Sequence, residues 1–130
     1  MEILNVLAAA AASWVFGAVW YMALAKPWMA AAKITVDENG RPANDSALPY
    51  IMSAVAMILV AGMMRHILVM AGLEGIGKSA TVGFGIGLFF ISPWIMTNNA
   101  YGDRPFKLTL IDGGYAVFGC TIIGAVLAMF

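Results

Sequence analysis

Charged residues are scarce in this sequence, since only 11% of its 130 residues are Asp, Glu, Lys or Arg. Soluble domains carry about 25%, so the composition excludes an ordinary water-facing globule. The seven basic and seven acidic residues balance, and the basic ones are scattered along the chain. This differs from the clustered positive surface of nucleic-acid-binding proteins. We therefore expect a single domain with no nucleic-acid partner.

Cysteine and histidine are almost absent. Cys120 is the single cysteine and His66 the single histidine, so no disulfide forms within the chain and the three or four ligands of a zinc site are missing. A haem would have to use a methionine or share its ligands with another chain. We expect no metal site and no cofactor. Because no pairing of nucleophile and base is evident either, we expect no enzymatic activity.

Apolar sequence is abundant instead, with 62% hydrophobic residues and a mean hydropathy of +0.88. Long apolar stretches cover residues 3–25, 48–73, 77–96 and 108–130. Each is near or above the ~20 residues that a helix needs to cross ~30 Å of hydrocarbon. The sequence therefore predicts an all-α integral membrane protein, a bundle of four transmembrane helices with one polar loop at residues 26–47.

The basic residues predict the orientation of these spans, because cytoplasmic loops carry an excess of Lys and Arg. The first and third loops lie on the same side and hold Lys26, Lys33, Arg41, Arg104 and Lys107. The opposite side has only Lys78 and, near the end of the second span, Arg65. We expect both termini to face away from the cytoplasm, which in a bacterial inner membrane places them in the periplasm.

The polar loop has local signals of its own. Pro27 and Trp28 suit a short interfacial helix that reaches Ile34. Asn39-Gly40 favours a turn, and Ser46 is a suitable cap for the second span.

Small residues recur at every fourth position within three of the spans. They are Asn5, Ala9, Ser13 and Gly17 in the first, Gly83 and Gly87 in the third, and Asp112, Ala116, Cys120, Gly124 and Ala128 in the fourth. Such spacing lets helix backbones approach closely in a membrane. We predict that these stripes are contact faces, either within one chain or between copies.

Asp112 is the most conspicuous single residue, because it lies inside an apolar span and begins a small-residue stripe. A charge at this depth needs a partner. One interpretation is a proton or ion site. The other is a hydrogen-bonded anchor near the start of the helix, with Asn98, Asn99 or Lys107 as its partner.

Polar residues gather at the same end of the third and fourth spans. The candidate site for a ligand or lipid headgroup comprises Trp94, Asn98, Asn99, Arg104, Lys107, Asp112 and Tyr115. Pro93 is expected to kink the helix just before them. The alternative is that these residues cap a tight hairpin, with the aromatic side chains in an interfacial belt.

Residues 72–79 match the phosphate-binding pattern of Gly, four residues, then Gly-Lys-Ser. That chemistry requires a strand before the loop and a soluble helix after it. Because a membrane span stands on each side, we interpret the match as coincidental.

Two segments carry a resemblance to a known family. The first comprises residues 17–21 with Trp28-Met29, and the second comprises Asn98-Asn99, residues 102–105, Lys107, residues 112–115, Gly119 and Gly124. In these segments the chain resembles a bacterial membrane family catalogued as domain of unknown function 1761. The resemblance covers most of the chain, implies a four-helix membrane protein and adds no catalytic residue.

Two functions remain open. The first is a non-enzymatic accessory or structural subunit, with membrane lipids and other transmembrane helices as its partners. The second is an oligomeric transporter of small solutes or protons that uses Asp112.

Overall fold

A computed structural model describes residues 2–42 and 46–130. Its helices are α1 (Glu2–Ala23), α2 (Ala25–Ala32), α3 (Leu48–Met70), α4 (Ile76–Gly85), the π-helical turn η1 (Ile86–Ile91), α5 (Ser92–Tyr101) and α6 (Phe106–Leu127). The described residues contain no strand, only an isolated bridge between Val36 and Pro42. Four helices are long and apolar enough to cross a membrane, the third being the continuous run Ile76–Tyr101. The predicted all-α bundle is confirmed.

The third span is longer than expected from hydropathy, since it continues to Tyr101 instead of ending near residue 96. Thr97, Asn98 and Asn99 therefore lie on a helix and not in the hairpin loop. The Thr97 hydroxyl donates to the Pro93 carbonyl, 3.0 Å away, so this polar side chain is satisfied without leaving the helix. Before Pro93 the helix widens into η1, an adjustment that accommodates a missing backbone donor.

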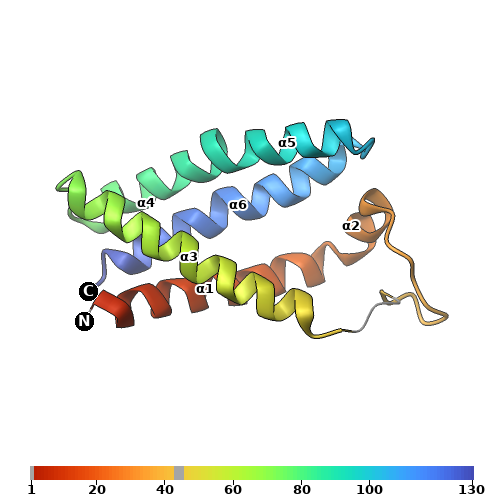
Figure 1. The fold of residues 1–130 in the computed structure, drawn as a ribbon, viewed down its shortest axis with the longest axis horizontal. Coiled ribbons are helices and arrows are strands. Elements are labelled where there is room, and N and C mark those ends of the chain that lie inside the picture. Colours follow the sequence, from red (N-terminus) through yellow and green to blue (C-terminus); the bar gives the residue numbers. More distant parts are fainter. Residues whose placement is uncertain (1, 43–45) are drawn as a thin grey trace.

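Helix α6 is the centre of the bundle and contacts every other helix. Figure 1 shows α1 on one side of it and α4–α5 on the other, with α3 crossing α1. The two termini and the α3–α4 loop lie at one end, and α2, the polar loop and the α5–α6 hairpin lie at the other. Buried positions make up 44% of the most apolar stretch of α6 and 22% or less of the others. The outer helices therefore turn most of their surface away from the bundle.

The predicted features of the polar loop are largely present. Pro27 lies in the first turn of α2, Gly40 adopts a positive φ of 75° in the turn after Asn39, and the Ser46 hydroxyl accepts a hydrogen bond from the Leu48 backbone at the start of α3. Residues 43–45 lie outside the described part.

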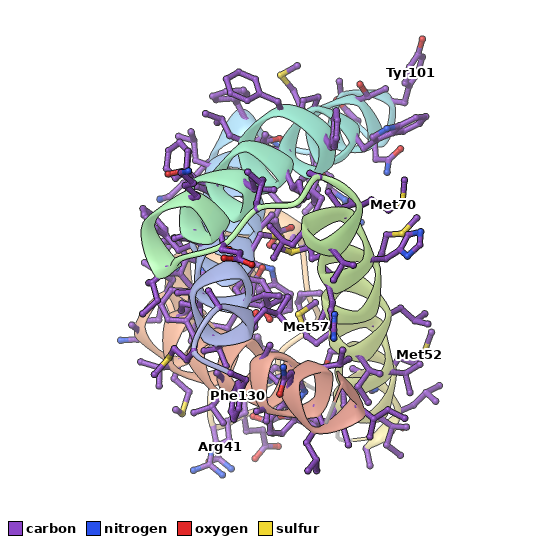
Figure 2. The ribbon with its side chains drawn as sticks, turned by 90° about the vertical axis from the view of Figure 1, so that its left-hand side faces the viewer. Arg41, Met52, Met57, Met70, Tyr101 and Phe130 are labelled. Carbon is purple, nitrogen blue, oxygen red and sulfur yellow. The ribbon has the colours of Figure 1, made fainter. Side chains whose placement is uncertain are left out.

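Large apolar side chains cover the outer surface. Figure 2 looks at the end of the bundle that carries the termini, and there Met52 and Met70 of α3 point outward whereas Met57 points inward. Met52 and Met70 are both largely exposed. A soluble protein rarely exposes so much apolar surface, whereas a bilayer covers it.

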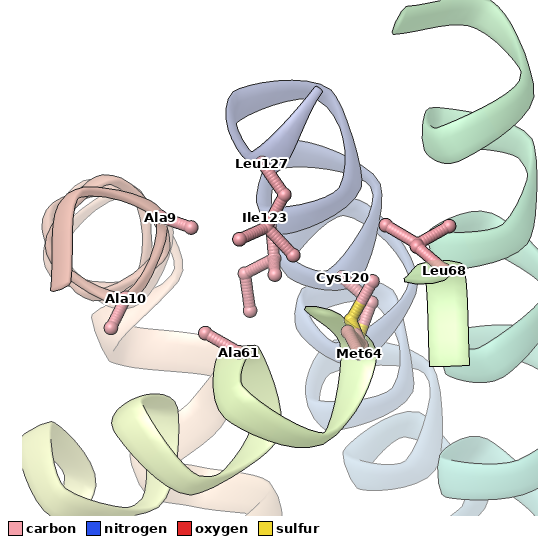
Figure 3. Close-up of a cluster of buried hydrophobic side chains, with 8 residues drawn as sticks. All are labelled: Ala9, Ala10, Ala61, Met64, Leu68, Cys120, Ile123 and Leu127. Atoms are coloured by element: carbon pink, nitrogen blue, oxygen red, sulfur yellow. The ribbon is translucent and has the colours of Figure 1, made fainter. Parts of the chain in front are cut away.

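The hydrophobic core lies where α1, α3 and α6 converge. Helix α1 contributes only alanines to it, and the larger side chains come from α3 and α6, as Figure 3 shows; the cluster comprises Ala9, Ala10, Ala61, Met64, Leu68, Cys120, Ile123 and Leu127. Cys120 is buried within this cluster, as expected for a member of the small-residue stripe that was predicted to be a contact face.

Helix α6 approaches α4 and η1 so closely that backbone meets backbone at three glycines. A Cβ atom built on Gly83 would lie 2.7 Å from the carbonyl carbon of Cys120, and one on Gly87 would lie 2.7 Å from that of Ala116. On α6, a Cβ on Gly124 would lie 2.8 Å from the carbonyl carbon of Ser79. No side chain fits at such distances, so glycine is required at all three positions. We call this the glycine contact.

Candidate functional site

Polar and aromatic side chains of α1 and α6 meet at the end of the bundle opposite the termini. The Tyr21 hydroxyl donates a 2.7 Å hydrogen bond to Oδ1 of Asp112. One residue earlier, the Trp20 indole N–H donates to the carbonyl oxygen of Ile111 at 2.9 Å. These two bonds join segments 91 residues apart in the sequence.

Tyr115 lies next to this pair on α6. Its hydroxyl donates to the Ser13 carbonyl oxygen at 3.2 Å, and its ring meets that of Tyr21 edge-on with centroids 5.5 Å apart. Trp28 of α2 also packs edge-on against Tyr21, with ring centroids 5.7 Å apart. Aromatic rings from three helices therefore pack together around Tyr21, the residue that donates to Asp112.

Glycines make room for these rings. A Cβ on Gly17 would lie 2.7 Å from the Tyr115 ring, and one on Gly114 would lie 2.7 Å from the Trp20 ring. The Tyr115 ring of α6 thus fills the space beside Gly17 of α1, and the Trp20 ring of α1 fills the space beside Gly114 of α6. We call this interlocked set of Gly17, Trp20, Tyr21, Asp112, Gly114 and Tyr115 the aromatic contact.

The partner of Asp112 differs from those expected from the sequence. Asn99 instead donates to the Thr109 hydroxyl at 3.1 Å, and Asn98 and Lys107 are exposed. Among the described residues, no Lys or Arg forms an ion pair with Asp112. The reason is helical geometry, because Asp112 lies nearly two turns into α6, where its side chain faces α1 and not the preceding hairpin.

The other predicted ligand residues do not form one site. Trp94 is 71% exposed on the outer face of α5, and Asn98 also points outward. Arg104 lies in the α5–α6 hairpin, where its guanidinium donates to the Ala32 carbonyl oxygen near the end of α2. Of the predicted set, only Asp112 and Tyr115 are brought together.

The sequence did contain a signal for the residues that were missed. The stripe of Ala9, Ser13 and Gly17 reaches Tyr21 if it is continued by four residues, and the α6 stripe begins at Asp112. The predicted stripe ended at Gly17 because only small residues were counted as part of a contact face.

The chemistry available to this site is limited. Among the described residues no group of three His, Cys, Asp or Glu side chains could hold a metal ion. The phosphate-binding pattern at residues 72–79 runs from the end of α3 into α4, so no strand precedes it. A partly buried carboxylate that accepts a hydrogen bond from a phenol can link two helices or exchange a proton.

These features define the protein as a helical membrane protein with four spans and an interlocked α1–α6 interface. The family described as Protein of unknown function (DUF1761) matches residues 4–128, and the chain belongs to it. No curated protein and no solved structure matches the chain. Both segments that carry the family resemblance, residues 17–21 and 112–115, contribute to the aromatic contact.

Proposed function

We propose that this protein is a non-enzymatic accessory or structural subunit of a larger membrane assembly. The observation that supports this is a second small-residue stripe on α4, formed by Gly77, Thr81 and Gly85. Thr81 is exposed, and a Cβ on Gly77 or Gly85 would meet no atom within 4 Å. Because such stripes let transmembrane helices approach closely, this one is suited to a helix of another chain.

Purification tests the proposal. Tagged protein is extracted from native membranes in a mild detergent, and proteins bound at stoichiometric levels are identified by mass spectrometry. We expect a reproducible partner that is lost in Gly85→Leu and retained in Ala56→Leu, which places the same leucine side chain at an exposed position of α3. Recovery of the chain alone, or retention of the partner by Gly85→Leu, would contradict the proposal.

The alternative is an oligomeric transporter of small solutes or protons. It is favoured by the Tyr21–Asp112 pair, an ionisable group inside a span, where such residues often mark ion pathways. The test is flux through reconstituted vesicles, with Asp112→Asn as the variant. Flux that disappears in a variant still folded in detergent supports transport, whereas unchanged flux removes Asp112 from the mechanism.

We also propose that the protein lies in a bacterial inner membrane with both termini in the periplasm. Lys26, Lys33, Arg41, Arg104 and Lys107 belong to the end of the bundle opposite the termini, which is the distribution that the positive-inside rule associates with the cytoplasmic side. Reporter fusions to the C-terminus test this, since a reporter active only in the periplasm should be active there.

A further inference from the structure

The end of the bundle that carries the termini has a cavity that neither function above uses. It has a volume of about 510 Å³ and lies between α1, α3, α4 and α6; its walls include Asn5, Leu68, Leu73, Leu127 and Phe130. Small-molecule sites typically measure about 300–1,000 Å³. Figure 2 views the bundle from this end.

Charges of both signs line this cavity. Arg65, from the last turns of α3, contributes a partly buried guanidinium, and Glu74, from the α3–α4 loop, contributes an exposed carboxylate. A cation and an anion that line the same cavity are complementary to a ligand that carries both charges.

The start of α4 adds hydrogen-bond donors. Gly75, its N-cap, has a φ of 95° and provides no side-chain cap, so the first N–H groups of a ten-residue helix lack side-chain acceptors at the positive end of its dipole. Ser79, one turn further on, lines the cavity and is only 2% exposed. Its hydroxyl can therefore donate a hydrogen bond to a ligand in the cavity.

A second cavity of about 460 Å³ adjoins the first and shares Arg65 and Val69 with it. Its other lining residues are Ile3, Val6, Gly62 and His66. This groove lies between α1 and α3, mostly among apolar residues of two membrane spans. Polar groups at the end of a span next to an apolar groove match the division of a lipid into headgroup and acyl chain.

We propose that the two cavities together bind a zwitterionic phospholipid. Its phosphate lies beside Arg65, Ser79 and the first turn of α4, its ammonium group beside Glu74, and an acyl chain follows the groove between α1 and α3. The residues 72–79 that imitate a nucleotide-binding loop thus serve a phosphate without the strand that nucleotide binding needs. This site is separate from the outer stripe of α4 and from Asp112.

Native mass spectrometry of the purified chain in detergent tests the assignment. Phosphatidylethanolamine is titrated against diacylglycerol with the same acyl chains. We expect one phosphatidylethanolamine per chain and binding of diacylglycerol at least about tenfold weaker, because hydrogen bonds to a charged phosphate are the strong ones. Equal binding of both lipids would overturn the proposal. So would displacement of the lipid by equimolar inorganic phosphate, which would indicate a site for a soluble anion.

Variants identify the contacts. Arg65→Gln and Ser79→Ala should each weaken binding of phosphatidylethanolamine, by about tenfold and about threefold. Lys78→Gln is the matched control, since it removes a charge from an exposed neighbour outside the cavity lining, and its affinity should stay within about twofold of the original.

Glu74→Gln tests the ammonium contact. Because Glu74 is exposed, this variant should fold even if Arg65→Gln does not. It should weaken binding of phosphatidylethanolamine and leave that of phosphatidic acid, which has no ammonium, unchanged. Unaltered affinity for phosphatidylethanolamine in both Glu74→Gln and Ser79→Ala would overturn the proposal.

Discussion

Helix α6 packs against its two main neighbours in different ways. Towards α4 and η1 it forms the glycine contact, in which backbone touches backbone at Gly83, Gly87 and Gly124. Towards α1 it forms the aromatic contact, in which rings fill the space left by glycines and hydrogen bonds join Tyr21 to Asp112 and Trp20 to Ile111. Both contacts need glycine, but in the first the neighbour is rigid backbone and in the second it is a side chain.

The difference decides what each contact tolerates. A methyl group placed against a backbone carbonyl forces two helices apart, whereas one placed against a ring meets a group that a second substitution can remove. The aromatic contact is therefore the adjustable interface of α6 and the glycine contact the fixed one.

The largest effect is expected for Gly83→Ala. Because the added methyl overlaps the Cys120 backbone, we expect a loss of at least about 3 kcal/mol in the free energy of unfolding, the upper range for overpacking. SDS-induced unfolding followed by circular dichroism measures it. Gly85→Ala is the control, since it lies two residues away facing open space. If both variants were equally stable, the glycine contact would not be rigid.

Gly17→Ala should cost about 1–3 kcal/mol in the same assay, because its methyl group meets the Tyr115 ring. In a Tyr115→Ala background the added cost should fall below about 0.5 kcal/mol, since the ring is gone. This rescue separates the two contacts, as no side-chain substitution can rescue Gly83→Ala. Strictly additive losses at Gly17 and Tyr115 would remove the distinction.

Tyr21→Phe keeps the ring and deletes the hydroxyl that donates to Asp112. We expect a loss of about 0.6–1.7 kcal/mol in the free energy of unfolding, the range for hydrogen bonds between membrane helices. Asp112→Asn should cost less, because the amide oxygen still accepts. Tyr101→Phe, at a tyrosine that is 90% exposed, is the matched control and should be neutral. A neutral Tyr21→Phe would show that packing alone holds the aromatic contact.

The smallest effect is expected in the α5–α6 hairpin, outside both contacts. Asn99→Ala removes the bond to the Thr109 hydroxyl, and the protein should lose about 0.5–1 kcal/mol of unfolding free energy. The adjacent Asn98→Ala, on an exposed side chain, should leave stability unchanged. A loss at Asn99 as large as that at Gly83 would mean that the hairpin, and not the glycine contact, limits stability.

Much of this architecture could be predicted from the sequence. The four spans follow from hydropathy because the cost of burying polar groups in lipid applies to each segment by itself. The small-residue stripes follow from helix periodicity, and the structure places Gly83, Gly87 and Gly124 where α4, η1 and α6 meet. The end of the third span was harder to predict, because a helix can continue past the hydrocarbon where polar side chains such as Thr97 find hydrogen-bond partners within it.

The candidate site was predictable only in part. Asp112 and Tyr115 were identified as unusual residues, but Asp112 was assigned partners close in sequence. Its partner Tyr21 lies 91 residues away, and no local pattern states which helix α6 will face.

The sequence by itself thus determined that this is a helical membrane protein, where its spans lie and which faces allow close approach, because these properties depend on composition and on a repeat of 3.6 residues. The tertiary structure alone decided that α6 lies at the centre and that rings of α1 and α6 each pack against a glycine of the other helix. It also decided that Arg65, Glu74 and Ser79 line the same cavity. Such pairings arise only when helices distant in sequence pack together, since each contact depends on the relative rotation and depth of two helices.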